Sequence, residues 1–328
     1  MCVRRWLWPA LLIIAACGQP AAPATAPPSA STTPTAAATP SAVGLECRLP
    51  IVTYAGGGWH GSWLDLSTGS VTQDPAGDGG LFFSRSVTRW LPVRREAVSP
   101  DGLRYAYTEG GVGQTPARLH VVEAGSGKDT AYSLPPSPFG VFDFASDAVY
   151  LRITWEGSFG LWRVDLGSGK VVQVASINDL WAGDGNTVWA GSVNPNDPHH
   201  LEGIEVQPDQ VDQVTIANGN RQTWFYRPVT TSRVIAVDGE GDPIIEVFAG
   251  IDTGNGLYTS SDVPDQFLEL TAPGTARPLD LPRESLWGYA VDSHGLWLGG
   301  QGGIYLLRKD GGLSQVSTTP AQPAGGCI

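Results

Sequence analysis

Two copies of a short Gly-Ser-Gly-Lys segment, at 125–128 and 167–170, carry residue types that could bind phosphate. A phosphate-binding loop also needs a glycine five residues before the Gly of its Gly-Lys pair, and a Ser or Thr after the lysine. Both segments have valine at the glycine position, and neither lysine is followed by Ser or Thr. The Gly-x-Gly-x-x-Gly spacing at 56–61 runs into a strand pattern, whereas a dinucleotide site needs a helix there. The sequence therefore predicts hairpin turns at these places, with no nucleotide and no other cofactor.

Two further segments offer residue types that could bind a metal ion. Asp197-Pro198-His199-His200 has imidazole and carboxylate groups, but adjacent strand residues point to opposite faces and no second ligand cluster accompanies them. Asp238–Asp242 mimics a calcium loop, yet Pro243 stands where that loop needs its glycine, and no Glu closes the loop. We predict a solvated loop and a tight turn, and no metal site.

Recognised catalytic motifs are missing from the sequence. There is no Gly-x-Ser-x-Gly nucleophile elbow, and the cysteines are all assigned to other roles below. We therefore assign no catalytic residue. A pair of carboxylates acting on a glycosidic bond stays open as an alternative, because the chain has 32 acids and their separation is not visible in the sequence.

Tryptophan is the residue type that most invites a ligand. Four of the 12 tryptophans lie beside Gly, Pro or polar residues typical of loops: Trp59, Trp90, Trp181 and Trp287. Aromatic loop residues near acids would suit a protein, peptide or glycan ligand. The alternative is packing in the core, which we expect for the tryptophans within strand patterns, namely Trp63, Trp155, Trp162, Trp189, Trp224 and Trp297. The pattern assigns no individual ligand-binding residue.

The composition of the 328-residue chain limits both its fold and its partners. Gly and Pro number 42 and 26, which is too many for a helix bundle. The formal net charge of −12 argues against nucleic acid as a partner, because proteins that bind nucleic acid present a basic patch.

The N-terminus has the pattern of a secretory signal peptide over residues 1–16. Two arginines precede the apolar run Trp6–Ala16, which is too short to span a bilayer and ends in small residues. The next residue is Cys17, and Ile14-Ala15-Ala16-Cys17 resembles the lipobox of bacterial lipoproteins. The alternative is an ordinary signal peptide followed by an unrelated cysteine.

The lipobox resemblance implies a location for the protein. In that family the chain is cut before the cysteine, which then carries a diacylglyceryl group and fatty acyl chains such as palmitate. The matching residue here is Cys17. The resemblance therefore implies an exported protein that is lipid-anchored to the outer face of a bacterial membrane, at the cell surface or on the periplasmic side.

Residues 17–46 are expected to form a disordered tether after the lipidated cysteine. Ala, Pro, Ser and Thr dominate this stretch, so it cannot bury enough apolar surface to offset the entropy of ordering. Cleavage of the signal would remove two arginines and no acid, which makes the mature chain still more acidic. We expect the lipid, rather than charge, to hold the protein at the membrane.

Two cysteines remain once Cys2 leaves with the signal peptide and Cys17 carries lipid. They are Cys47 and Cys327, and an even pair in an exported chain predicts a disulfide. The alternative is two unrelated thiols. A bond between these positions requires the two ends of 47–328 to meet in space, which is a property of closed rings of blades.

Two short motifs recur from Cys47 onward, where strand-like runs alternate with Gly, Asp and Pro turns. The first is an acidic turn before an aromatic-rich strand, with its acid at Asp101, Asp147, Asp184, Asp238 and Asp292. The second is an apolar strand that enters a Gly-rich turn, at Leu64–Gly69, Val121–Gly127, Val164–Gly169, Leu268–Gly274 and Leu306–Gly311. A unit of ~40–50 residues with several short strands is typical of a propeller blade. We expect the Asp and Gly residues to shape turns.

The clearest copies of these motifs resemble a known family. Ser99–Tyr107 resembles the repeat of TolB-like, WD-repeat-like β-propellers, and Asp292–Tyr305 is similar to the blade repeat of extracellular sensor propellers. The resemblance implies an all-β β-propeller over 47–328, with six blades of four-stranded antiparallel sheets and seven blades as the alternative. Ala76–Val93 and Val214–Ser232 depart from a clean repeat, and we interpret them as insertions. Such repeats are shared by unrelated functions, so they supply no functional residues.

The sequence thus favours a membrane-anchored binding or scaffold module whose propeller receives a protein, peptide or glycan. The alternative is an extracellular propeller enzyme that acts on glycans or related polymers through acidic residues in the central funnel. The lack of a recognised catalytic motif favours binding. Acids that converge in the funnel with raised pKa values would favour the enzyme, and scattered acids would favour binding.

Overall fold

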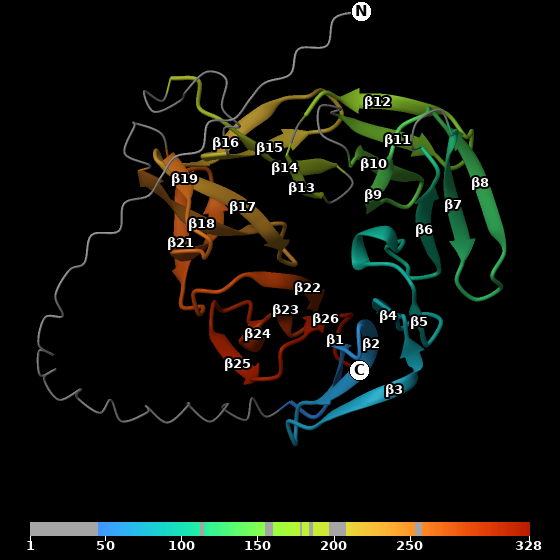
Figure 1. The fold of residues 1–328 in the computed structure, drawn as a ribbon, viewed down its shortest axis with the longest axis horizontal. Coiled ribbons are helices and arrows are strands. Elements are labelled where there is room, and N and C mark those ends of the chain that lie inside the picture. The colour runs from blue at the N-terminus through green and yellow to red at the C-terminus, as the bar shows by residue number, and fades with distance from the viewer. Residues whose placement is uncertain are drawn as a thin grey trace, which may run out of the picture. The chain divides into compact units, whose positions relative to one another are not determined.

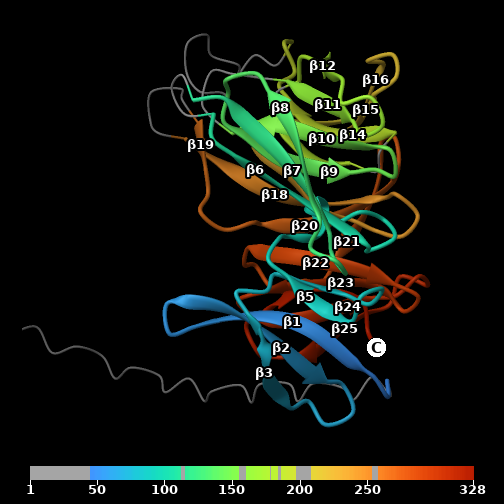
Figure 2. The ribbon, with the colours of Figure 1, turned by 90° about the vertical axis from the view of Figure 1, so that its right-hand side faces the viewer.

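The computed structural model describes residues 45–111, 115–154, 160–177, 179–183, 186–196, 208–252 and 258–328. Its 26 strands form antiparallel sheets arranged around a ring (Figures 1 and 2). The one helical segment among the described residues is a single 3-10 turn, η1 (Arg95–Ala97). No helix in these ranges is long and apolar enough to cross a membrane. The predicted all-β propeller with six blades is confirmed.

Each blade is a sheet whose strands follow one another outward from the ring centre. The first blade contains β26 (Gln322–Pro323), β1 (Arg48–Ala55), β2 (Gly58–Asp65) and β3 (Val71–Asp78). The second contains β6 (Arg104–Glu109), β7 (Ala117–Glu123) and β8 (Asp129–Leu134). The third contains β9 (Phe139–Phe144), β10 (Ala148–Ile153), β11 (Leu161–Asp165) and β12 (Val171–Ala175).

The remaining three blades continue the same order around the ring. The fourth contains β13 (Leu180–Gly183), β14 (Thr187–Ser192), β15 (Gln210–Thr215) and β16 (Arg221–Tyr226). The fifth contains β17 (Thr230–Val237), β18 (Pro243–Asp252), β20 (Gln266–Ala272) and β21 (Thr275–Leu279), with β19 (Tyr258–Ser260) paired to β18. The sixth contains β22 (Leu286–Asp292), β23 (Gly295–Gly300), β24 (Gly303–Leu307) and β25 (Leu313–Ser317).

Antiparallel order places alternate turns of each blade on opposite faces of the ring. The turns between first and second strands, and between third and fourth strands, share one face, which we call the hairpin face. Its described acidic turns contain Asp101, Asp147, Asp238 and Asp292, and its Gly-rich turns span 66–70, 124–128, 166–170, 216–220, 273–274 and 308–312. Asp184 lies outside the described residues. Both repeated motifs therefore shape the hairpin face, while the connections between blades lie on the opposite face, the loop face.

Local hydrogen bonds close the hairpin turns. After β11, Asp165 Oδ1 accepts hydrogen bonds from the hydroxyl of Ser168 at 2.7 Å and from its backbone N–H at 2.8 Å. These bonds, the hydroxyl bond first, lower the pKa of Asp165 to about 2. Gly169 has φ 71°, a left-handed conformation that glycine adopts without strain. The turn after β7 is alike, since Ser126 Oγ donates to Glu123 at 2.8 Å. Both Gly-Ser-Gly-Lys segments are hairpin turns, as predicted.

The hydrophobic core lies between neighbouring blades. Leu119 of β7 in the second blade and Leu151 of β10 in the third belong to one buried cluster, and both have no exposed surface. Similar clusters join the third blade to the fourth, the fourth to the fifth and the fifth to the sixth. Successive side chains of a strand point to opposite faces of its sheet, so each blade packs against the blade on either side and the ring is built from these contacts.

An inserted hairpin fills the space between the first and second blades. It consists of β4 (Phe82–Ser84) and β5 (Arg89–Leu91), which pair with each other. Trp90 is buried there against Trp63, with ring centroids 5.8 Å apart. Asp74 accepts a hydrogen bond from each of these two indoles, at 2.9 and 3.0 Å. The predicted insertion at 76–93 thus contains an inserted hairpin that belongs to the core, but its residues 76–78 are part of the regular strand β3.

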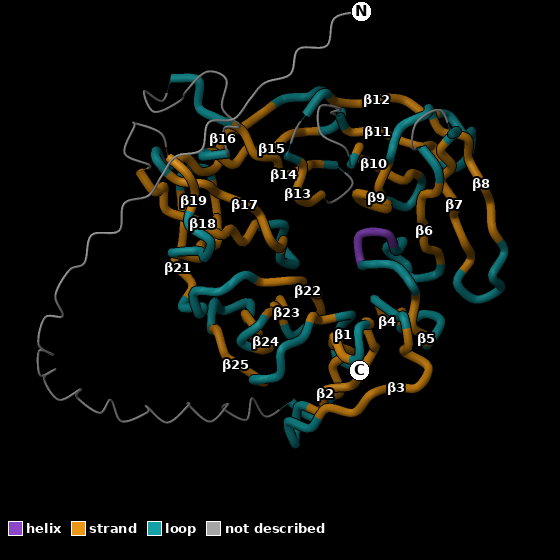
Figure 3. Tube along the Cα trace, viewed as in Figure 1, coloured by secondary structure: helices purple, strands orange, loops and turns teal. Residues whose placement is uncertain are grey.

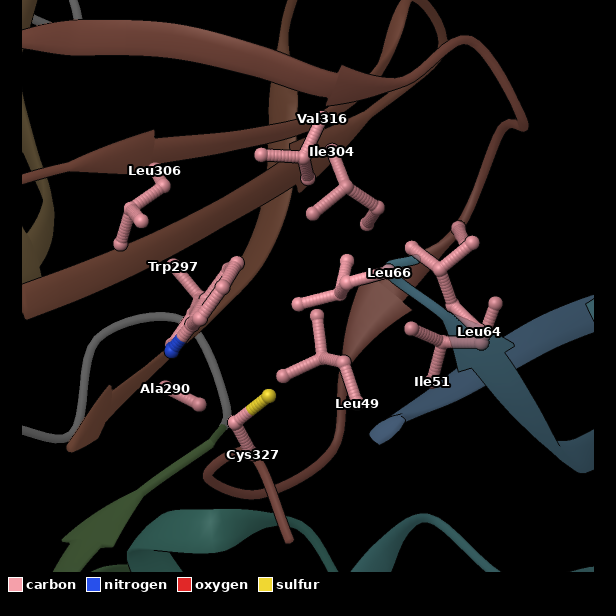
Figure 4. Close-up of a cluster of buried hydrophobic side chains, with 11 residues drawn as sticks. Leu49, Ile51, Leu64, Leu66, Ala290, Trp297, Ile304, Leu306, Val316 and Cys327 are labelled. Carbon is pink, nitrogen blue, oxygen red and sulfur yellow. The ribbon is translucent and has the colours of Figure 1, made fainter. Parts of the chain in front are cut away.

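The two ends of the described propeller meet in the first blade. β26 pairs with β1 through Ile51↔Pro323 and Val52↔Gln322. The predicted Cys47–Cys327 disulfide is present, with the two Cα atoms 5.8 Å apart. Beneath it, Leu49 and Leu64 of the first blade pack with Trp297 and Leu306 of the sixth in one buried cluster (Figure 4). Strand pairing, a covalent bond and apolar packing therefore all close the ring at one seam.

Two details of the sequence interpretation were wrong. The second blade lacks a regular innermost strand: residues 92–98 take that place, contain η1, and pair with β6 only through the bridge Val98↔Tyr105. Val214–Ser232 is no insertion, because it holds a regular hairpin turn and the outermost strand β16. That strand begins with three exposed polar residues, which hide its strand pattern in the sequence.

Candidate functional site

The innermost parts of the blades enclose a cavity of about 230 Å³, which we call the axial cavity. β9, β13, β17, β22 and β26 contribute to its lining, as does segment 92–98, whose η1 is the purple turn at the ring centre in Figure 3. Its charged residues are Arg94, Arg95, Glu96, Asp143 and Arg152, and its aromatic residues include Trp181, Trp287 and Tyr289. All six blades thus contribute side chains to one site.

Arg95 is held across the axial cavity by Tyr289. Its Nη1 donates a hydrogen bond to the Tyr289 hydroxyl at 2.9 Å, and its guanidinium lies 4.6 Å from the centroid of the same ring. The two residues are 194 positions apart, on η1 of the second blade and β22 of the sixth. A hydrogen bond and a cation–π contact together fix the guanidinium without neutralising it.

The other two arginines approach the axial cavity from different elements. Arg152 at the end of β10 donates a hydrogen bond from Nη1 to the backbone oxygen of Leu180 at 3.0 Å. This bond links the third blade to the fourth. Arg94 precedes η1 and is exposed, and within the described part of the chain its guanidinium makes no hydrogen bond or ion pair.

The axial cavity contains more basic than acidic side chains. Three arginines face two carboxylates, Glu96 and Asp143, in a chain whose formal net charge is −12. The cavity is therefore a cationic exception within an acidic protein.

The four loop-like tryptophans of the sequence have three different environments. Trp181 and Trp287 line the axial cavity, and 39% of Trp287 is exposed. Trp59 is 37% exposed and packs edge-on against Tyr54 at the β1–β2 turn, with ring centroids 5.1 Å apart. Trp90 is only 6% exposed. The interpretation of these tryptophans as loop residues is wrong, because all four lie in strands: β2, β5, β13 and β22. Two of the four tryptophans are brought together in one site.

A second cavity, of about 310 Å³, lies on the hairpin face between the fifth and sixth blades. Burial, and next the charge of the neighbouring Asp238, raises the pKa of Asp242 in this cavity. Asp238 Oδ1 accepts hydrogen bonds from two backbone N–H groups of its own turn, and Glu269 is paired with Arg277. The acids there hold turns and strands together. A carboxyl with a raised pKa thus lies away from the ring axis.

The described segments that resemble known binding motifs form turns and strands of the propeller. Asp238–Asp242 forms the tight turn that we predicted. Residues 56–61 form the turn between β1 and β2 and the first half of β2. The described residues hold no group of His, Cys, Asp and Glu side chains arranged to bind a metal ion. Asp197-Pro198-His199-His200 and Cys17 lie outside the described residues.

Sequence reasoning missed the arginines of the axial cavity. Arg94 and Arg95 lie in a segment that matches neither repeated motif, and Arg152 lies in an ordinary strand pattern. One signal was available: adjacent arginines are uncommon in a chain with only 20 basic residues. Their convergence with Tyr289 depends on ring closure and is invisible in a linear sequence.

Comparison with known proteins gives similarity in structure alone. No protein-family model matches the sequence, and neither does any curated protein. Solved structures similar to this one include an oligogalacturonate lyase in complex with manganese, at 16% identity and TM-score 0.45, covering 83% of this chain and 74% of that chain. Another is TolB from Acinetobacter baumannii, at 13% identity and TM-score 0.41, covering 85% and 67%.

A third similar structure is the β-propeller domain of the Trilobed protease from Pyrococcus furiosus, at 10% identity and TM-score 0.46, covering 85% of this chain and 88% of that chain. At such identities no activity of these proteins carries over to this chain. The chain is a six-bladed β-propeller by its own sheet order and ring closure.

Proposed function

We propose that this protein is an exported, lipid-anchored binding module that holds its ligand in the axial cavity. One observation carries the proposal: side chains from all six blades converge on a single cavity with charged and aromatic groups. Among the described residues, the two Gly-Ser-Gly-Lys segments and Asp238–Asp242 form turns. A binding site on the axis is therefore the reading that the chemistry of the side chains supports best.

The mixture of charges on the axis favours binding over glycan cleavage. The enzyme alternative needs two acids at the reacting bond, one of which keeps its proton. Glu96 and Asp143 share the cavity with three arginines, so the acids there are outnumbered by bases. The raised pKa of Asp242 occurs on the hairpin face, away from this cavity. We therefore propose a receptor for a protein, peptide, glycan or smaller ligand, and no catalytic step.

The proposed location rests on the N-terminal sequence. The lipobox-like Ile14-Ala15-Ala16-Cys17 supports lipid attachment at Cys17, and residues 17–46 would then form the tether that separates the propeller from the membrane. Replacement Cys17→Ala should release the protein from the membrane fraction or block its processing. A cleaved Cys17→Ala protein that still sediments with membranes would contradict the anchor.

Native mass spectrometry of the full chain, gently extracted from its own membranes, tests the binding function. We expect a bound adduct in the unmodified protein, loss of that adduct in Trp287→Ala, and its retention in the control Arg118→Ala. Arg118 is an exposed residue of β7 outside the axial cavity. The absence of any adduct, or its retention in Trp287→Ala, would contradict a ligand site on the axis.

A further inference from the structure

We infer that the axial cavity takes a small organic anion, with a carboxylate or phosphate group attached to a flat or ring-shaped body. This inference rests on the proposed binding function and names the chemical class of its ligand. Three features of the cavity carry it: the excess of guanidinium groups, the way these groups are held, and the aromatic faces beside them.

The excess of guanidinium groups sets the charge of the ligand. Arg94, Arg95 and Arg152 outnumber Glu96 and Asp143, although acids outnumber bases by 32 to 20 in the whole chain. A random set of side chains from this protein would make an acidic cavity. Arginine is also the residue whose planar fork of donors matches the oxygens of a carboxylate or phosphate. The expected ligand is therefore anionic.

The bonding of the guanidinium groups leaves donors for a ligand. A guanidinium has five N–H donors. Arg95 uses one on the Tyr289 hydroxyl and Arg152 uses one on the Leu180 oxygen, at 2.9 and 3.0 Å. Both acceptors are uncharged, so neither arginine is neutralised by its bond. Arg95 and Arg152 are thus held in place before a ligand arrives, which lowers the entropy cost of binding.

The aromatic lining sets the shape of the ligand. Trp287 is 39% exposed although it lies on β22, next to the ring axis. Trp181 also lines the cavity, and it extends into a neighbouring cavity between the fourth and fifth blades. Indole faces offer apolar contact area at a low entropy cost, because the side chain has few rotatable bonds. Trp181 and Trp287 would contact a flat body while the arginines bind its acidic group.

The volume of the axial cavity limits the size of the ligand. The volume of the axial cavity is about 230 Å³. This is below the usual range of ~300–1,000 Å³ for drug-sized ligands. A single acidic ring fits this space, whereas a folded protein domain does not.

Matched pairs of small ligands test the inference by isothermal titration calorimetry on the full chain at low salt. The probes are glucuronate, glucose 6-phosphate, uncharged glucose and inorganic phosphate. We expect one of the two acidic sugars to bind at least 10-fold more tightly than glucose, and more weakly as salt is added. The tighter of the two identifies carboxylate or phosphate as the preferred group. Comparable binding of inorganic phosphate would show that the flat body contributes nothing.

Variants of the cavity separate this inference from the function on which it rests. Arg94→Ala should weaken binding of the acidic sugar at least several-fold, Arg94→Lys should restore part of it, and Arg118→Ala should leave it unchanged. Trp287→Ala should weaken both acidic and neutral sugars. Binding that depends on Trp287 but is equal for glucose and the acidic sugars would overturn the anion while leaving the axial site intact. Binding of the acidic sugar that neither Arg94→Ala nor Trp287→Ala weakens would overturn the inference and would also contradict the axial site. Binding of none of the four probes would overturn the inference alone.

Discussion

The hairpin face and the axial cavity use polar residues in opposite ways. On the hairpin face Asp101 bonds within its own turn, where its Oδ1 accepts from the Ser99 hydroxyl at 2.6 Å and from the Leu103 N–H at 3.0 Å. In the axial cavity Arg95 bonds to a residue of another blade, Tyr289. The turns are complete without a ligand, whereas the cavity brings charged groups from distant blades to one open space.

This difference separates structural from functional residues within the repeat. The Asp and Gly residues that recur in the sequence build turns on the hairpin face. Arg94 and Arg95 come from segment 92–98, which replaces a regular strand and belongs to neither repeated motif. In this propeller, departure from the repeat is therefore a better guide to the binding site than the repeat itself.

The largest effect is expected at the seam, where the hairpin face lacks a turn. β26 and β1 come from opposite ends of the chain, so no hairpin can join them, and the Cys47–Cys327 disulfide stands in its place. Reduction should destabilise the propeller by about 2–5 kcal/mol, measured by thermal unfolding. Hydrogen exchange should rise first in β1, because the two backbone hydrogen bonds that Arg48 exchanges with Ile328 lie next to the disulfide.

The matched control for the disulfide is a Cys47→Ser/Cys327→Ser double variant. Its free energy of unfolding should equal that of the reduced unmodified protein, and adding the reductant should not change it. Equal exchange of β1 in the oxidised and reduced proteins would show that strand pairing and the cluster around Leu49 and Trp297 hold the seam without the bond.

A smaller effect is expected from Asp292, which tests the contrast directly. Its side chain is 6% exposed, and its Oδ2 accepts a hydrogen bond from the Cys327 N–H at 2.7 Å. Asp292→Ala should cost about 1–3 kcal/mol, because a buried donor loses its partner. Chemical denaturation measures this loss. Asp292→Ala should leave the ligand affinity unchanged. Trp287→Ala should instead weaken ligand binding and leave the free energy of unfolding nearly unchanged.

Asp147 provides the control acid for Asp292. It belongs to the same repeated motif, but its side chain is 72% exposed and its ion pair with Arg163 lies at the surface. Asp147→Ala should therefore cost at most about 1 kcal/mol. If Asp292→Ala has normal stability but no longer binds the ligand, then acids of the hairpin face serve binding and the proposed contrast with the axial cavity is wrong.

The parts of the fold that the sequence predicted depend on local chemistry. Asp and Gly turns, such as the one around Asp165 and Gly169, carry their conformation in a few adjacent residues. Their recurrence predicted six blades, with seven as the alternative. The Cys47–Cys327 bond followed from the count of cysteines and from the idea of a closed ring.

The parts that the sequence did not predict depend on contacts between distant segments. Trp90 has loop-like neighbours, yet its indole is buried by Trp63 and bonded to Asp74. Arg95 meets Tyr289 only because the second and sixth blades face the same axis. The sequence contains no local signal for either contact, so burial of Trp90 and the cationic cavity both emerged only in the folded ring.

The smallest effect is expected from the lysines of the two Gly-Ser-Gly-Lys turns. The Lys128 side chain is 71% exposed, and its ammonium lies 3.5 Å from Glu123. Lys128→Ala and Lys170→Ala should each change the free energy of unfolding by no more than about 0.5 kcal/mol, as is usual for exposed substitutions. Calorimetry with ATP should show no binding. ATP binding that disappears with either variant would show that the turn is a ligand site and contradict its structural role.

The glycine in the same turn sharpens this last prediction. Gly127 has φ 73°, and a Cβ at that position would meet no other atom within 4 Å. Gly127→Ala therefore changes only the conformational cost, which is about 1–2 kcal/mol for a left-handed residue with a side chain. Thermal unfolding should rank Gly127→Ala below Lys128→Ala in stability. The opposite ranking would mean that the lysine side chain contributes more to stability than the left-handed backbone conformation of the glycine.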